Sequence, residues 1–64
     1  MITKPIRELA PGTMFSPVDH PEVIYIMHRF HDLNHEKSFL LENVKRKHVF
    51  ESLMNPDTLV IVRG

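Results

Sequence analysis

The stretch from Pro21 to Phe30 constrains the fold more than any other part of the sequence, because it is the longest β-prone run of the chain. Successive side chains of a strand point to opposite faces, so Ile24 and Ile26 share one face while Tyr25 and Met27 share the other. A strand that is apolar on both faces is typical of the middle of a sheet. We therefore expect residues 22–30 to form a central strand, buried on both faces and paired on both edges.

Turn signals divide the rest of the chain into short strands. Ala10-Pro11-Gly12-Thr13 predicts a tight turn, because Pro presets φ at position i+1 and Gly takes the positive φ that a type II turn needs at i+2. Asn55-Pro56-Asp57-Thr58 predicts a type I turn with Asn at i and Pro at i+1. In addition to the central strand, we expect strands at residues 13–16, 37–43 and 58–62, the last of these buried on both sides. Residues 31–36 are the expected tip of a hairpin.

Residues 43–54 fit two structures. As a helix, the segment has Asn43 as an N-cap, and Val49 with Leu53 at i, i+4 spacing, before a stop at Asn55-Pro56. As a strand, it shows a weaker alternation. We favour a turn over 43–47 followed by a strand from His48 to Leu53, and one short helix within 43–54 is the alternative.

The chain has 64 residues and no cysteine, which predicts one small domain over residues 1–64 without a disulfide. A core of this size seldom supplies more than about 3–5 kcal/mol of net stability without a staple. Docking two apolar faces is a common remedy, so a homodimer is one expected state.

Short strands separated by Pro and Gly turns predict a mainly β fold, either a small barrel or a strongly bent antiparallel sheet. The alternative is a three- or four-stranded sheet that carries a helix at Val44–Met54. The order of Glu8–Phe15, Val23–Ile26 and Thr58–Val62 resembles the layout of small SH3-like barrels in bacterial and bacteriophage proteins. The resemblance implies a compact binding module without catalysis, a phage or mobile element as one source, and no particular partner.

Composition argues against several classes of function. Eight Lys and Arg balance eight Asp and Glu, so no overall field draws the chain to phosphate or to an anionic membrane. The Met1 end lacks a signal-peptide core and no apolar run approaches the ~18 residues of a membrane span, which predicts a cytoplasmic chain without membrane contact. With no Cys nucleophile, no nucleophile motif around a serine and only Gly12 and Gly64 as glycines, we expect no enzyme and no cofactor.

Protein contact is the function that these exclusions favour. A chain this short needs most of its aromatic side chains in the core, and one or two left exposed beside a methionine would form an apolar interface patch. The candidate residues for such a patch are Tyr25, Met27, Phe30 and Phe39. We therefore expect a regulator or adaptor that acts through protein–protein contacts, with a partner of unknown identity.

Nucleic-acid binding is the alternative function. Basic side chains cluster before residue 49 and could meet phosphates, with Tyr25 or Phe30 stacking on bases. The candidate residues are Arg29, Lys37, Lys45, Arg46, Lys47 and His48. The lack of a net basic charge argues against this function.

Five histidines are the most unusual feature of the composition. On a helical turn His31 and His35 could face one metal ion, and zinc would need a further ligand such as Glu36 or His28. The segment reads as a hairpin tip, so no metal site is assigned and His31 and His35 stay weak candidates. A pH-responsive surface is the other reading, because histidine gains its charge close to physiological pH.

Overall fold

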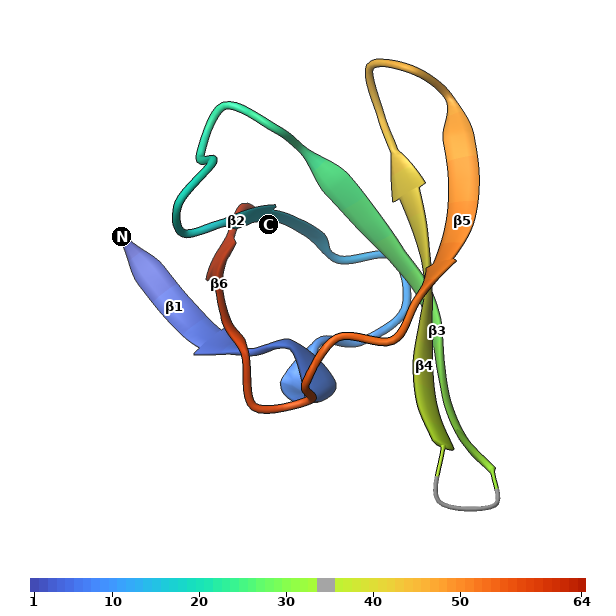
Figure 1. Cartoon of the computed structure of the whole chain (residues 1–64). Helices are drawn as coiled ribbons and strands as arrows, with labels where there is room; N and C mark the ends of the chain where they lie inside the picture. The colour runs from blue at the N-terminus through green and yellow to red at the C-terminus, as the bar shows by residue number, and fades with distance from the viewer. Residues whose placement is uncertain (34–35) are drawn as a thin grey trace.

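A computed structural model of the chain describes residues 1–33 and 36–64, which form one six-stranded antiparallel sheet and no α-helix (Figure 1). The elements are β1 (Ile2–Pro5), the 3-10 helix η1 (Ile6–Glu8), β2 (Met14–Pro17), β3 (Tyr25–Leu33), β4 (Glu36–Asn43), β5 (His48–Ser52) and β6 (Leu59–Val62). In space the strands follow the order β1-β6-β2-β3-β4-β5. The prediction of a mainly β chain is confirmed. Because the sheet is not closed in the described residues, with β1 and β5 at its two ends, it is a bent sheet and not a barrel.

Strand β3 lies in the middle of the sheet, as expected, and pairs with β2 on one edge and with β4 on the other. It begins at Tyr25, later than expected, because residues 21–22 form a turn. It also runs further, to Leu33, which pairs with Glu36 of β4. The expected hairpin is thus confirmed, while residues 34 and 35 at its predicted tip lie outside the described part of the chain.

A bulge in β3 decides which side chains reach the core. The pairing with β4 shifts register between Met27 and Arg29, so that His28 is an extra residue without an opposite number. One extra residue reverses the alternation of faces beyond it. Phe30 therefore shares the inner, core-bearing face with Met27, opposite Phe39, whose ring centroid is 4.6 Å from its own.

The expectation that the central strand is buried on both faces is wrong. On the inner face Met27 is fully buried, whereas on the outer face Ile26 is half-buried and His28 is exposed. Nε2 of His28 lies 2.8 Å from Oε1 of Glu42 on the same outer face. The physical reason is that the chain supplies one layer of sheet, and most of its outer face has nothing packed upon it.

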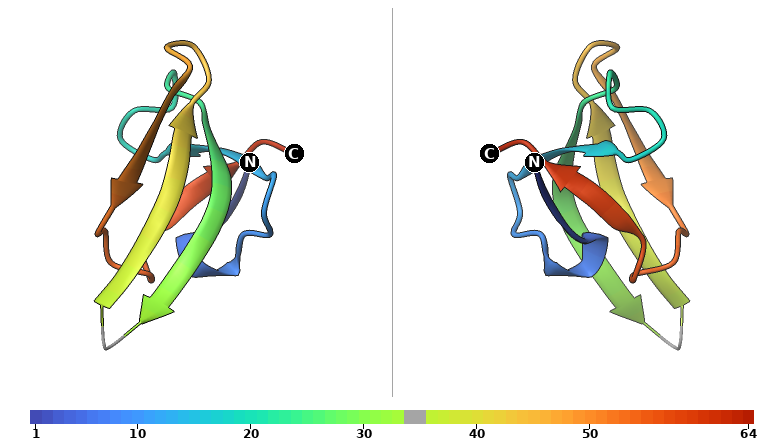
Figure 2. Two further views of the ribbon diagram at one scale, coloured as in Figure 1. Left: turned by 90° about the vertical axis from the view of Figure 1, so that its right-hand side faces the viewer. Right: turned by 90° about the vertical axis from the view of Figure 1, so that its left-hand side faces the viewer.

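The core lies inside the bend of the sheet, and η1 sits at one end of it (Figures 1 and 2). Its buried members are Ile6, Leu9, Phe15, Met27, Phe39, Leu41 and Val60, with Tyr25, Phe50, Met54 and Val62 packed against them. Aromatic contacts join three strands across it, because the ring of Tyr25 lies 5.7 Å from that of Phe15 and 5.7 Å from that of Phe50.

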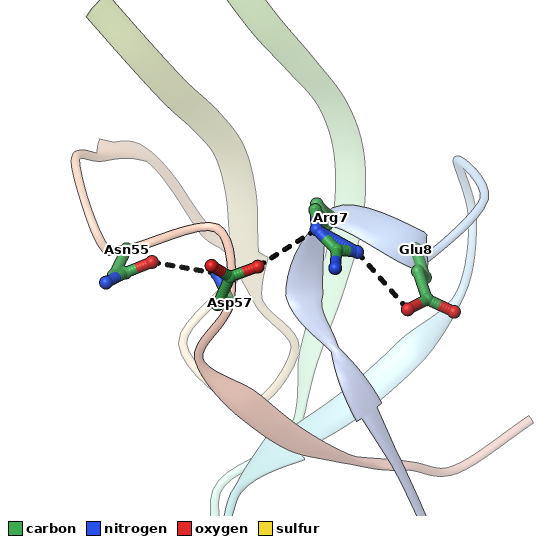
Figure 3. Close-up of polar contacts among 4 residues, drawn as sticks. All are labelled: Arg7, Glu8, Asn55 and Asp57. Atoms are coloured by element: carbon green, nitrogen blue, oxygen red, sulfur yellow. Dashed lines mark hydrogen bonds and ion pairs between the residues drawn. The ribbon is translucent and has the colours of Figure 1, made fainter.

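The connection between β5 and β6 holds η1 in place. The backbone N–H of Ile6 donates to the carbonyl of Thr58 at 2.8 Å, and that of Arg7 donates to the carbonyl of Pro56 at 3.1 Å. Nε of Arg7 is also 3.0 Å from a carboxylate oxygen of Asp57 (Figure 3). These contacts position the buried side chain of Ile6 at the end of the core.

Both predicted tight turns are confirmed. The N–H of Thr13 donates to the carbonyl of Ala10 at 3.1 Å, and Gly12 has the expected positive φ of 91°. The N–H of Thr58 donates to the carbonyl of Asn55 at 3.0 Å. The side chain of Asn55 also accepts a hydrogen bond from the N–H of Asp57 at 2.9 Å (Figure 3), which is the local bonding that favours asparagine at the start of a turn.

The turn and strand favoured for residues 43–54 are confirmed, and the helix alternative is wrong. Asn43 does not cap a helix, and its side-chain oxygen accepts the N–H of Arg46 at 3.1 Å within a turn over 44–47. Lys47 then takes a left-handed φ of 53° and the chain returns as β5. This return pairs Phe50 with Leu41 and packs its ring against the core, which outweighs isolated i, i+4 contacts on an exposed helix.

Strand β6 is buried on both sides, as predicted, through Val60 and Ile61. On the outer face Ile61 pairs with Ser16 of β2, which is also fully buried. The Nε group of Arg63 donates to the Ser16 hydroxyl at 3.0 Å, and the same guanidinium donates to the carbonyl of Pro21. This set of Arg63 contacts holds the β2–β3 connection against the end of β6.

Substitution of Phe39 tests the position of the core. Phe39→Ala should lower the free energy of unfolding by about 3–5 kcal/mol, which leaves little net stability in a chain of this size. Urea unfolding followed by circular dichroism measures the change. The control is Leu53→Ala, because Leu53 is 74% exposed and its loss should change stability by no more than about 0.5 kcal/mol. Equal urea midpoints for the two variants would contradict this core.

Substitution of Arg63 tests the contacts beneath the β2–β3 connection. Arg63→Ala leaves the buried hydroxyl of Ser16 without its partner and should cost about 1–2 kcal/mol of unfolding free energy. The matched control is Arg7→Ala, which removes only exposed ion pairs and should cost less than about 1 kcal/mol. A double-mutant cycle with Ser16→Ala measures the coupling, and additive losses would show that the hydrogen bond is not made.

Candidate functional site

Strand β5 forms one of the two open edges of the sheet. In the described residues no strand pairs with its outer side, so the N–H and C=O groups on that side point away from the sheet. We call this side of His48–Ser52 the β5 edge. The five residues of β5 include no proline. Strand β1, at the other end of the sheet, has only four residues and ends at Pro5, which has no backbone N–H to donate. An open strand edge is a template for a further strand.

An apolar cleft opens beside the β5 edge. It has a volume of about 280 Å³, and residues of β5 and of the β2–β6 pair line it. The bend of the sheet sets these strands opposite each other, with β2 and β6 on the left and β5 on the right in Figure 1. The residues that line it are Phe15, Pro17, Val18, Asp19, Tyr25, Leu41, Phe50, Ser52, Met54, Thr58, Leu59 and Val60. Val18 and Leu59 are 51% and 54% exposed, so apolar surface continues from the cleft to its rim.

The β5 edge and the apolar cleft together can bind an extended chain. A strand added to β5 would find backbone donors and acceptors along the edge, and its alternate side chains would point toward the inner face. Asp19 is the only carboxylate among the lining residues, and neither a histidine nor a basic side chain lines the cleft in the described part of the chain. Apolar contact, and not acid–base chemistry, is therefore what this arrangement offers.

Only one of the residues predicted to bind protein lines the cleft. Tyr25 lies there with its side chain half-buried, and Phe30 is 36% exposed on the inner face of the β3–β4 hairpin. Met27 and Phe39 are buried in the core, so a partner cannot contact their side chains in the folded chain. The bulge at His28 accounts only for Phe30, because Tyr25 and Met27 precede it and share the inner face by simple alternation.

Sequence reasoning missed the β5 edge, because the position of a strand within a sheet depends on pairings between distant segments. The signal that was available lies in Val49 and Leu53, two apolar side chains on a segment that also supplies Phe50 to the core. In the structure Val49 and Leu53 are exposed. Exposed apolar side chains on an edge strand indicate a surface that can pair.

The structure brings four of the six predicted nucleic-acid contacts together. Lys45, Arg46 and Lys47 lie in the turn between β4 and β5, and His48 begins β5 with its ring stacked on Phe50 at 5.8 Å. All four side chains are exposed. The other two lie apart from this cluster: Lys37 is near the opposite end of β4, and Arg29 is within β3.

A second hollow, of about 790 Å³, adjoins the turn that carries these basic residues. It is lined by residues 22–25 before and at the start of β3 and by residues 43–46. Lys45 and Arg46 therefore share it with Tyr25, although the acidic Glu22 shares it too. This groove is larger than the cleft beside β5, and charged side chains line it.

The histidines form no metal site in the part of the chain that the structure describes. No group of three or more His, Cys, Asp or Glu side chains in residues 1–31 and 37–64 is arranged to hold a metal ion. His31 lies in β3 and is half-buried, and His35 lies outside the described residues.

Comparison with known proteins gave no family model, curated protein or solved structure that matches this chain. The resemblance to SH3-like barrels thus stays a prediction from the layout of the sequence. Among the described residues, the structure has no helix of the length and apolar character needed to cross a membrane.

Proposed function

We propose that the chain is a non-catalytic binding module, a regulator or adaptor that pairs its β5 edge with an extended segment of a protein partner. The observation that supports this function best is an open strand edge, free of proline, that borders an apolar cleft. The edge supplies backbone hydrogen bonds and the cleft receives alternate side chains, which is a recurring mode of peptide recognition. A binding role without catalysis also agrees with the resemblance to SH3-like modules, of which this bent sheet would be an open variant.

The surroundings of the β5 edge define the kind of segment that would fit. The lining of the cleft favours apolar side chains at every second position of the partner. Lys47, which immediately precedes β5, favours an acidic residue at the neighbouring end of the segment. Burying one aliphatic side chain contributes about 1.5–3 kcal/mol, part of which is lost in ordering the peptide, so a short peptide should bind with micromolar affinity.

Selection of peptides from a displayed random library tests this function. Peptides that bind the chain should be apolar at alternate positions and should slow hydrogen exchange of the β5 amides. Val18→Asp, which places a charge on the rim of the cleft, should weaken their binding about tenfold or more. Ile2→Asp is the matched control, because Ile2 is 61% exposed on β1 and does not line the cleft.

The proposed function is overturned if no selected peptide protects the β5 amides. It is also overturned if Val18→Asp and Ile2→Asp bind the selected peptides equally well. Thermal melting of both variants establishes that each is folded before its affinity is compared.

Nucleic-acid binding has one observation in its favour, which is a groove that Lys45 and Arg46 line together with Tyr25. Such a groove could hold a phosphate while a base stacks on the ring. The same groove also contains Glu22, and the chain as a whole has no net charge. Protein binding is therefore the function that we put first.

A titration of labelled single-stranded RNA and DNA separates the two functions. We expect no salt-sensitive binding at low ionic strength, because no net basic field concentrates the polyanion. Binding that is lost in the Lys45, Arg46 and Lys47→Ala variant, and retained in the Arg29 and Lys37→Ala control, would favour the nucleic-acid function instead. The control residues lie outside the turn and so preserve its charge.

A further inference from the structure

We propose that a second copy of this chain occupies the β5 edge, in an antiparallel pair of β5 strands centred on Val49. This inference rests on the proposed function, because it uses the same edge, and it names the partner. The pair would join two six-stranded sheets edge to edge about a twofold axis. The charges along β5, its exposed apolar side chain and the small core of the chain support it.

The order of charges on β5 is complementary to itself about Val49. In a twofold antiparallel pair centred there, Val49 faces Val49 of the second copy, and His48 faces Phe50. Lys47 ends the turn before β5 with its left-handed φ of 53°, next to the last facing pair, and its long side chain reaches Glu51 of the second copy, a contact that the symmetry makes twice. Lys47 and Glu51 are both exposed, and neither forms an ion pair with the side chains of residues 1–31 and 37–64.

Three neighbouring registers match the charges of the strand less well. A pair centred on His48 sets Lys47 opposite the aliphatic Val49, and only Lys45, within the turn, then comes level with Glu51. A pair centred on Phe50 sets the aliphatic Val49 opposite the carboxylate of Glu51. A pair centred on Glu51 sets two carboxylates opposite each other, and like charges at facing positions destabilise a strand pair. Of the four registers, the one centred on Val49 alone brings Lys47, the residue next to the strand, level with Glu51 at both ends.

The proposed pair of β5 strands would also extend the outer face of the sheet from one copy to the other. A row of facing residues crosses it from Met14 through Ile26 and Glu42 to Val49. Val49 is 48% exposed at the end of this row, and its counterpart in a second copy would cover it. Most natural strand edges are guarded by proline or by charges that repel a further strand. The one charged residue within β5 is Glu51, which Lys47 of a second copy would neutralise.

Charge reversal tests the pair and its register. Sedimentation equilibrium up to millimolar concentration should show a monomer that converts to a dimer. Lys47→Glu and Glu51→Lys should each raise the dissociation constant about tenfold or more, because each turns two attractive contacts into repulsive ones. The double variant carrying both reversals should regain the dissociation constant of the original chain, since its charges are complementary again.

Lys45→Glu is the matched control, because it makes the same charge change in the same turn but outside the strand pair. It should leave the dissociation constant unchanged, and circular dichroism establishes that every variant is folded. The proposed dimer is overturned by a chain that stays monomeric at all concentrations, by single reversals that behave like Lys45→Glu, or by a double variant that is not restored.

The outcome for the dimer is separable from that for the proposed function. If the chain stays monomeric and a library peptide still protects the β5 amides, the second copy is wrong and the binding of an extended segment stands. If the dimer and its charge pattern are found and no peptide protects β5 in the monomeric Lys47→Glu variant, the dimer stands and the pairing with another protein falls.

Discussion

A single sheet built from so short a chain can cover only one of its faces, and this constraint governs the rest of the structure. The sheet bends so that the inner sides of its strands converge on Phe15, Met27 and Phe39, and η1 brings Ile6 to one end of the same core. The outer face stays largely open to water, except where the Arg63 contacts lie over Ser16. Stability thus depends on a few buried side chains, with no second layer to compensate for the loss of one.

The candidate site is a consequence of the same bend. Six short strands curve far enough to enclose a core, but in the described residues β5 and β1 do not meet. The incomplete closure leaves both an edge with free backbone groups and a cleft where the inner faces fail to join. Binding at this place would continue the packing that the fold began, because an added strand extends the sheet and covers apolar side chains that the chain alone leaves accessible.

Local signals in the sequence predicted much of the fold and little of the site. The Pro-Gly and Asn-Pro turns, the central strand and the hairpin follow from residues close together in the chain, such as Gly12 with its positive φ. The bulge at His28 carries no local signal, and without it simple alternation would place Phe30 on the outer face with Ile26. The open edge of β5 was equally hidden, because it results from the order of all six strands. Basic residues near in sequence, Lys45–Lys47, are near in space, whereas Lys37 and Arg29 are not.

The bulge in β3 has a further consequence for the way the hairpin is assembled. Two long strands with regular alternation can slide past one another by two residues and still keep their apolar sides together. His28 interrupts that freedom, because a slide of two residues would separate the unpaired position from the Met27–Leu41 and Arg29–Leu40 pairs that border it. The bulge therefore favours a single register of β3 against β4. In that register Phe30 contacts the ring of Phe39 and Met27 pairs with Leu41, so both contacts fall on the inner face.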